Sequence, residues 1–310
     1  MDRPLMLVDA PSLYFRAFFG VPESMTTDDG TPVNAIRGFL DMLATLVRTR
    51  KPDRLVCAMD ANWRPAWRVE LVPSYKAHRV APGSPVGFVE EVPDTLKPQV
   101  PVILDVLAAF GIPAVGIADH EADDVLGTFA TRGPGPVEVV TGDRDLFQLV
   151  DDTVPVRVLY VGRGVSKLEV LDDAALLAKT GVKAAGYADF ATLRGDASDG
   201  LPGVPGVGEK TAARLVNRYG SLEGILTALD DPDSGFAPGL RAKLVAAGGY
   251  LANAAPVVRV VRDLPVPDVD TALPAAPLDS DAVVALAEKW NVAGSLSRLV
   301  DACAGAADGG

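Results

Sequence analysis

The sequence contains little cysteine, histidine or aromatic residue. It has two Cys and two His among 310 residues, and aromatic residues make up 6%. Cys57 and Cys303 lie far apart, which excludes a disulfide framework and favours a reducing compartment, so we expect a cytoplasmic protein. The scattered Cys and His also lack the ligand spacing of a tetrahedral zinc site.

Long hydrophobic runs are missing as well. The richest stretch, residues 102–118, is interrupted by Asp105 and Pro113 and is shorter than the ~20 apolar residues of a membrane span. The apolar run before Asp9 is too short for a secretory signal. The chain is still 48% hydrophobic, enough for one large core or two ordinary ones, which excludes general disorder. We expect no membrane partner.

The chain has fewer basic than acidic residues. The chain has 29 Lys and Arg against 41 Asp and Glu, a net charge of −12. Taken alone, this balance argues against a polyanionic partner. The net charge is misleading, however, if many of the acids lie at one metal site, because bound cations then reverse the local electric field. The position of the acids therefore decides the class of partner.

The first half of the chain alternates short apolar runs with amphipathic segments. Such alternation predicts an α/β fold, with a mostly parallel sheet and helices on both faces. We expect strands at residues 5–9, 55–60, 114–116 and 137–141, and helices at 34–50, 99–110, from 121 onward and at 146–150. Residues 63–100 are proline-rich and aperiodic, which is typical of a functional loop or arch rather than a connector.

The second half contains short helices separated by glycines. We expect helices at residues 173–180, 187–193, 209–219, 222–229, 240–251 and 281–300, with an extended stretch at 259–270. The sequence thus predicts an α/β core over residues 1–170 and a helical lobe over residues 171–310 that returns to the core at its end.

Acidic residues follow the predicted strands at several points. Because the carboxyl ends of parallel strands meet at one edge of a sheet, we expect these side chains to lie together. Carboxylates packed together are costly unless cations neutralise them, and an all-oxygen site suits Mg²⁺ or Mn²⁺. Their number indicates two ions ~4 Å apart, the arrangement used for phosphodiester hydrolysis. The residues are Asp9, Asp60, Glu121, Asp123, Asp124, Asp143 and Asp145.

Each of these acids also has a plainer explanation. An Asp after a strand often caps a helix, and acids in a first helical turn interact favourably with its dipole. For Glu121 or Asp124 alone we would favour this reading. Capping does not explain why all the acids fall on the same edge.

A glycine hairpin at residues 203–208 follows two further acids, Asp196 and Asp199. It is not an ATPase phosphate loop, because Glu209 rather than Lys follows Gly208, and no dinucleotide fingerprint is present. Backbone N–H groups at the start of the next helix can hold a DNA phosphate without reading sequence. The alternative is an ordinary helix-turn-helix connection. The basic residues of that helix, Lys210, Arg214 and Arg218, favour DNA.

Taken in order, six segments resemble the 5′-nuclease family, which comprises flap endonucleases and the 5′→3′ exonuclease domain of bacterial DNA polymerase I. The segments are residues 7–19, 59–60, 74–79, 121–126, 141–150 and 195–213. The resemblance implies a PIN-like 5′-nuclease core with an arch at about residues 63–100, and a helical lobe with a helix–three-turn–helix. No polymerase domain follows, so it implies a free-standing, monomeric bacterial member.

The implied activity is that of a metal-dependent, structure-specific 5′ nuclease. Such an enzyme, a 5′→3′ exonuclease or flap endonuclease, hydrolyses phosphodiesters of branched, nicked or primer-bearing DNA in replication and repair. Its substrates are 5′ flaps, nicks and overhangs, and often RNA–DNA hybrids. The resemblance also implies two Mg²⁺ or Mn²⁺ ions, and a K⁺ ion at the glycine hairpin.

The same resemblance assigns roles to particular residues. The first metal would be held by Asp9, Asp60, Glu121 and Asp123, and the second by Asp143, Asp145 and Asp199, with Asp124 as a bridge and Asp196 as an outer partner. Lys76 and Arg79 would contact the scissile phosphate, and Tyr75 would stack on a terminal base. Further DNA contacts are expected from Arg68, Gly203, Gly206, Gly208, Lys210, Thr211 and Arg214.

Two departures from the family pattern stand out. Pro11 stands where a small residue is expected after the first metal ligand, and residues 80–96 are acidic rather than basic, which weakens the expectation of a threaded strand. Without the nine site acids, 32 acidic residues face 29 basic ones, so DNA binding remains compatible with the charge. Three alternatives stay open: an RNA-directed nuclease of related fold, a non-catalytic junction-binding protein and a phosphatase.

Overall fold

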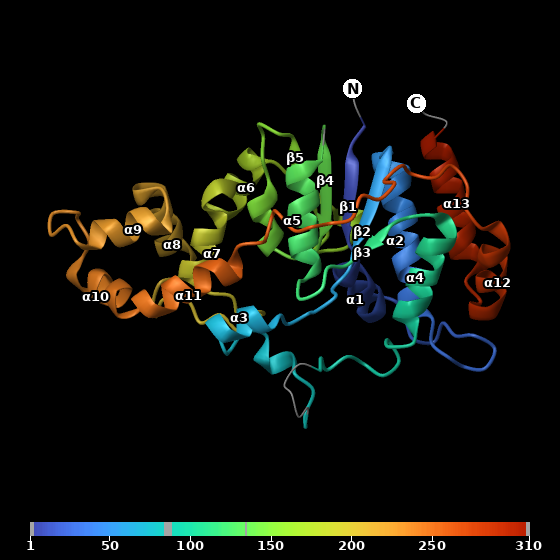
Figure 1. The fold of residues 1–310 in the computed structure, drawn as a ribbon, viewed down its shortest axis with the longest axis horizontal. Coiled ribbons are helices and arrows are strands. Elements are labelled where there is room, and N and C mark those ends of the chain that lie inside the picture. The colour runs from blue at the N-terminus through green and yellow to red at the C-terminus, as the bar shows by residue number, and fades with distance from the viewer. Residues whose placement is uncertain (1–2, 84–88, 134, 308–310) are drawn as a thin grey trace.

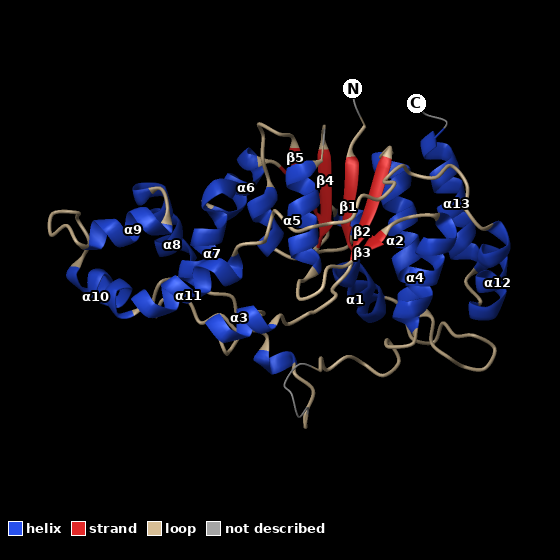
Figure 2. Cartoon of the chain, viewed as in Figure 1, coloured by secondary structure: helices blue, strands red, loops and turns tan. Residues whose placement is uncertain are grey.

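A six-stranded sheet forms the centre of the computed structural model, which describes residues 3–83, 89–133 and 135–307. The strands run in the order β3-β2-β1-β4-β5-β6, and Figure 2 shows the order from β3 to β5. All neighbours pair in parallel except β5 and β6. The bounds are β1 Leu5–Asp9, β2 Arg54–Ala58, β3 Ala114–Val115, β4 Val137–Thr141, β5 Val156–Tyr160 and β6 Glu169–Leu171. The predicted fold class is confirmed.

Both faces of the sheet are covered, as the unbroken apolar sequence of β1 predicts. Leu5 and Leu7 point into one core, shared with helix α5, whereas Met6 and Val8 point into the other. The second core lies under helices α1, α2, α4 and α13 (Figure 1). The bounds are α1 Ala10–Gly20, α2 Asn34–Arg50, α4 Gln99–Phe110, α5 Ala122–Arg132, α12 Ser280–Trp290 and α13 Ala293–Ala307.

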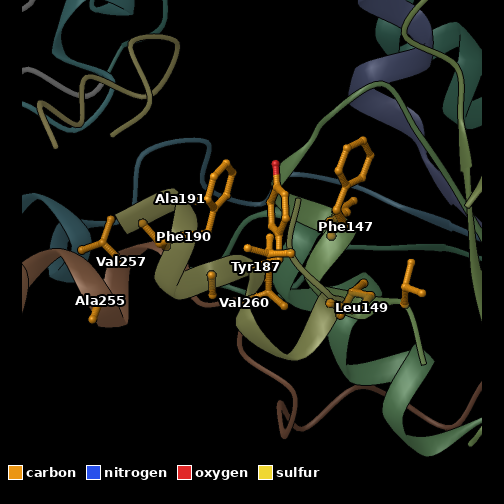
Figure 3. Close-up of a cluster of buried hydrophobic side chains, with 14 of the residues drawn as sticks. Phe147, Leu149, Tyr187, Phe190, Ala191, Ala255, Val257 and Val260 are labelled. Carbon is orange, nitrogen blue, oxygen red and sulfur yellow. The ribbon is translucent and has the colours of Figure 1, made fainter. Parts of the chain in front are cut away.

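The helical lobe shares the first of these cores with the sheet. Phe147, from the 3₁₀ helix η2 (Asp145–Leu149), lies 5.4 Å from the ring of Tyr187, which in turn lies 5.6 Å from Phe190 (Figure 3). The lobe is therefore packed firmly against the sheet. Its helices are α6 Asp173–Thr180, α7 Tyr187–Arg194, α8 Glu209–Tyr219, α9 Leu222–Leu229, α10 Pro238–Ala246 and α11 Gly248–Val258, with the 3₁₀ helix η4 at Ala184–Gly186.

Residues 63–83 and 89–100 lie beside the carboxyl ends of the strands (Figure 1). They contain helix α3 (Ala66–Leu71) and the 3₁₀ helix η1 (Ala77–Arg79). After η1, the Glu91 N–H donates to the Arg79 carbonyl at 2.8 Å. We call residues 63–79 the arch base.

Several elements differ from their sequence-based expectation. The single helix expected at residues 240–251 is two helices that meet at Ala247, and the one at 281–300 is broken at Asn291, whose φ is 50°. Residues 259–270 are extended but form no strand. Helices α1 and α3 and strands β5 and β6 were not predicted. Among the described residues, no helix is long and apolar enough to cross a bilayer.

Candidate active site

The predicted acids meet at the carboxyl edge of the sheet. The chain builds β1, β2 and β3 in one direction and then crosses to β4 on the other side of β1, so the strand order reverses between β1 and β4. Such a switch point is where open α/β sheets bind ligands. A cavity of about 180 Å³ lies there. Its charged lining residues are Asp9, Asp60, Lys76, Arg79, Glu90, Glu121, Asp123 and Asp143.

Asp9 ends β1 and caps α1. Its Oδ1 accepts the Ser12 N–H at 3.0 Å, and its Oδ2 accepts the hydroxyl of Thr141 at 2.7 Å. Pro11 occupies the first turn of α1, where it leaves no needed donor missing, so it does not displace the carboxylate. Burial raises the pKa of Asp9 to about 7, and the charges of Asp143 and Asp60 act in the same direction.

Asp60 and Asp123 approach the cavity from β2 and α5. The Ala122 N–H, at the start of α5, donates to Asp60 Oδ1 at 2.7 Å. Burial raises the pKa of Asp60, and the charge of Glu121 adds to the effect. Burial also raises the pKa of Asp123 well above its usual range, together with the charges of Asp143 and Asp9.

A second group of acids lies beside the first. Asp145 is 8% exposed, and its Oδ1 is buried without a hydrogen-bond partner. Burial raises its pKa well above the usual range, with contributions from Asp143, Asp199 and Asp196. Burial likewise raises the pKa of Asp199 to about 6, against the opposing charge of Lys76. Asp143 therefore stands between the two groups, within electrostatic reach of both.

Glu121 is held by three side chains of the arch base. Its carboxylate accepts the Tyr75 hydroxyl at 2.7 Å and Arg68 Nη1 at 2.8 Å, and it forms an ion pair with Lys76. Burial would raise the pKa of Glu121, but the charges of Lys76 and Arg68 outweigh it and hold the pKa below its usual range. Glu121 and Asp124 also form a capping box at the start of α5.

Asp124 does not reach the cavity. Its side chain is fully buried, and its Oδ1 accepts Arg68 Nη2 at 2.7 Å and the Val261 N–H at 2.9 Å. The structure thus places this carboxylate between the arch base and the segment that returns from the helical lobe. The arrangement does not favour the expected bridge between two metals.

Arg68 and Tyr75 are also placed differently from their expected DNA contacts. Both are 3% exposed and are directed at the acids of α5. Arg79 is accessible, and its Nη2 donates to the Ser198 carbonyl at 2.8 Å and to Asp199 at 3.3 Å. Of the arch-base residues expected to contact DNA or phosphate, Lys76 and Arg79 are the two that line the cavity.

The glycine hairpin is partly exposed, and its exposed residues could contact a phosphate. Gly206 and Gly208 are exposed, and so are Lys210 and Arg214 on α8, whereas Thr211 is half-buried. No side chain caps the N-terminus of α8, although the Thr211 N–H already donates to the Gly208 carbonyl at 3.0 Å. Gly203 is different. It is buried and donates its N–H to the Tyr250 hydroxyl at 3.0 Å.

Asp196 lies beside this hairpin rather than in the cavity. Its carboxylate accepts the Ser198 N–H at 2.8 Å and pairs with Arg194 at 3.2 Å. It therefore shapes the loop that carries Asp199, which agrees with an outer position.

The donor set fits a hard divalent cation. The ligands are carboxylate oxygens, several of them raise one another's pKa, and one buried oxygen of Asp145 lacks a partner. Across the described ranges, however, no three Asp, Glu, His or Cys side chains are close enough to hold a metal ion. Coordination would therefore require the carboxylates to move together.

Sequence reasoning missed several residues around the cavity. Arg16, in helix α1, packs against Gly142, where a Cβ would lie 3.3 Å from Arg16 Nη2 and 2.8 Å from Ser12 Oγ. Its Nε is buried without a partner. The signal was available: a basic residue seven positions after a strand-end acid lies on the same helix. Glu90, which also lines the cavity, gave no such signal because it follows an irregular segment.

Comparison with known sequences agrees with this architecture. Two family models match, the 5′-3′ exonuclease N-terminal resolvase-like domain over residues 4–181 and the 5′-3′ exonuclease C-terminal SAM fold over residues 182–281. A 5′-3′ exonuclease of Streptomyces coelicolor is 60% identical, with 95% of this chain and 98% of that protein covered. One from Mycobacterium tuberculosis is 52% identical, with 96% and 97% covered. DNA polymerase I of M. tuberculosis is 38% identical, and 97% of this chain matches 32% of that protein.

Solved structures share the fold at low sequence identity. A 5′-exonuclease of phage T5 with bound divalent metal ions has a TM-score of 0.64 at 18% identity, with 97% of this chain and 98% of that chain covered. The catalytic core of Rad2 in complex with DNA substrate has a TM-score of 0.57 at 18% identity, with 97% and 92% covered. With both family models matched in order and two full-length relatives above half identity, the chain belongs to the 5′-3′ exonuclease family.

Proposed function

We propose that this 5′-3′ exonuclease is a structure-specific nuclease that uses two Mg²⁺ or Mn²⁺ ions to hydrolyse DNA at junctions of single and double strand. The observation that carries the proposal is the cavity at the β1/β4 switch point. Six carboxylates line it, and Lys76 and Arg79 stand at the same opening. Such a site suits a phosphodiester whose own negative charge needs neutralising during cleavage.

Different residues would hold the metal ions and orient the phosphate. Asp9, Asp60, Asp123 and Asp143 would hold the first ion, and Asp143, Asp145 and Asp199 the second, with Glu121 at the side of Lys76. Bound ions supply a deprotonated water at neutral pH and stabilise charge on the phosphate oxygens. Lys76 and Arg79 would orient the same oxygens from the arch base. The buried floor formed by β1 and β4 excludes competing water from beneath.

Duplex DNA would be held away from the cavity by the glycine hairpin. The exposed N–H groups before α8 and the charges of Lys210 and Arg214 favour backbone phosphates. We propose 5′ flaps, nicks and overhangs as substrates, RNA–DNA hybrids as additional ones, and K⁺ bound by hairpin carbonyls. We also propose that the enzyme acts as a cytoplasmic, nucleoid-associated monomer.

The test is product mapping on a 5′-flap duplex labelled at either end. Cleavage is expected with Mg²⁺ or Mn²⁺ and none with chelator. Asp143→Asn combined with Asp145→Asn should lower the cleavage rate at least ~1,000-fold while flap binding is retained, because the change removes ligand charge but not the hairpin. Full activity in this double variant would disprove the site.

Matched substrates separate the remaining alternatives. An RNA-directed nuclease would turn over an RNA-only duplex faster than the 5′ DNA flap, and a phosphatase would hydrolyse a small phosphomonoester. A non-catalytic junction binder would leave the flap intact with either metal. We expect the DNA flap to be the preferred substrate because the helical lobe has no use in the other two reactions.

A further inference from the structure

Arg68 is one of the most buried charged residues of the molecule, although it lies in a segment next to the site opening. It is 3% exposed, and its guanidinium forms ion pairs with two different carboxylates. Nη1 contacts Glu121 Oε1 at 2.8 Å, and Nη2 contacts Asp124 Oδ1 at 2.7 Å. A planar guanidinium can reach two acids at once, which an ammonium cannot do with the same geometry.

The two acids connect three parts of the chain. Glu121 also binds Tyr75 and Lys76 of the arch base, and Asp124 also accepts the Val261 N–H from the segment after α11. Arg68 therefore lies where the arch base, helix α5 and the segment returning from the helical lobe meet. Its guanidinium is packed 4.7 Å from the ring centroid of Trp67 and 5.9 Å from that of Tyr75.

This placement keeps Arg68 away from a DNA phosphate, because both Nη atoms bind carboxylates and Nε, which has no hydrogen-bond partner, is buried. To reach solvent it would have to leave two buried carboxylates, which would then lack their shared counter-charge. The neighbouring cations differ in this respect. Lys76 and Arg79 line the cavity, and Lys210 and Arg214 are exposed.

We propose that Arg68 is a positioning residue: it fixes the carboxylates of Glu121 and Asp124 and thereby locks the arch base onto α5, without contacting the substrate. The proposal rests on the proposed function, since its consequence is that Glu121 and Lys76 keep their place at the cavity. It replaces the DNA contact that the sequence predicts for this residue.

The first experiment separates turnover from binding. Arg68→Met should lower kcat on a 5′-flap duplex at least ~10-fold, with KM changed less than ~2-fold, because the lost interaction orients the site without touching DNA. The dissociation constant, measured in the Asp143→Asn, Asp145→Asn background at several salt concentrations, should keep its salt slope. Arg214→Met, at an exposed site, should instead weaken binding and lower the slope by about 1. Arg132→Met, at the exposed C-terminal end of α5, should change neither kcat nor the strength and salt slope of DNA binding.

The second experiment needs no activity. In a double-mutant cycle on metal-free protein, Arg68→Met and Asp124→Asn should be strongly non-additive in the unfolding midpoint, because each removes half of the same buried pair. Arg68→Lys supplies a folded variant if Arg68→Met does not fold, and it should lower kcat without weakening binding. A weaker Kd with a smaller salt slope, unchanged kcat, or additive midpoints would each overturn the proposal. If wild-type protein does not cleave the flap, the proposed function fails, while the cycle still decides the role of Arg68.

Discussion

Asp9 both caps helix α1 and lines the acidic cavity, two roles that the sequence analysis treats as alternatives. Its Oδ1 caps α1 through the Ser12 N–H, and the same carboxyl group lines the acidic cavity. Capping positions the group, while burial and the nearby charges of Asp143 and Asp60 keep its pKa high. A capping role and a place in the acidic cavity are therefore compatible for this residue.

The raised pKa values predict how stability of the metal-free protein depends on pH. Asp9 has a folded pKa of about 7 and Asp199 of about 6, both above the ordinary aspartate value. Their protonation favours the folded state, so this stabilisation is complete below about pH 4 and is lost as pH rises through about 6 to 7. Thermal unfolding in chelator should therefore show a midpoint that falls over this range.

The Asp9→Asn variant is the control for this prediction, since an amide cannot ionise. Its midpoint should fall less steeply between pH 5 and 8 than that of the wild type. Saturating Mg²⁺ should reverse the wild-type trend, because cation binding favours the ionised carboxylates; at 100 times Kd the gain is ~2.7 kcal/mol. An unchanged slope in Asp9→Asn would show that Asp9 ionises normally.

At the level of single residues, the sequence predicts which acids gather but not which cations meet them. Asp9, Asp60 and Asp143 follow strands, and the rule that parallel strands end at one edge is enough to bring them together. Arg68 lies in the short helix α3, within a proline-rich part of the chain that has no regular apolar period, and only the way the chain folds back onto α5 decides whether it faces solvent or two carboxylates. No local sequence pattern predicts which of these two environments Arg68 has.

Helix α8 is the element on which DNA affinity should depend. Lys210 and Arg214 lie one turn apart on it and are exposed. Lys210→Gln and Arg214→Gln should each weaken flap binding and reduce the salt slope by about 1, with kcat at saturating DNA unchanged, because phosphate contacts position the duplex without taking part in cleavage.

Fluorescence anisotropy over 50 to 200 mM salt measures this prediction, with Lys51→Gln at the end of α2 as a control of equal charge. The combined Lys210, Arg214 variant should lower the slope by about 2. An equal loss of affinity in the Lys51 variant would mean that net charge, rather than the hairpin and α8, governs binding.

Element boundaries were predictable where a regular apolar period meets a glycine. The expected bounds of α8 and α9 match the structure, and Gly220 separates the two helices. Helix α12 ends instead at Asn291, whose backbone is in the left-handed conformation. The amphipathic pattern continues through this position, so the apolar spacing does not predict the break. Strands β5 and β6 were missed because only the three-residue 3₁₀ helix η3 (Val165–Lys167) separates them, so the alternation of strands with long helices stops here.

On the scale of the whole molecule, α13 covers the second core. Leu296, Leu299 and Cys303 are almost fully buried against α2 and its neighbours. Leu299→Ala should lower the free energy of unfolding by ~2–5 kcal/mol, since it opens a cavity in a packed core far from the acids. Urea unfolding measures the loss, and cleavage of a flap below the transition should stay at the wild-type rate.

Val245→Ala is the matched control, because Val245 is 61% exposed on α10 and its truncation should change the free energy by less than ~0.5 kcal/mol. Equal losses in the two variants would mean that α13 is not part of the cooperative core. A large loss of cleavage in a still-folded Leu299→Ala protein would show that the second core transmits strain to the site.

The two described ends of the chain meet on the side opposite the cavity. The Arg3 guanidinium donates to the Ala306 carbonyl, and both termini lie at the far edge of the sheet from the arch base (Figure 1). A short peptide could therefore close the chain into a ring, with new ends opened in the exposed turn at residues 231–235. A label or surface anchor attached beside Arg3 or Ala306 would lie across the sheet from the acidic cavity, so immobilisation there would leave the cavity open.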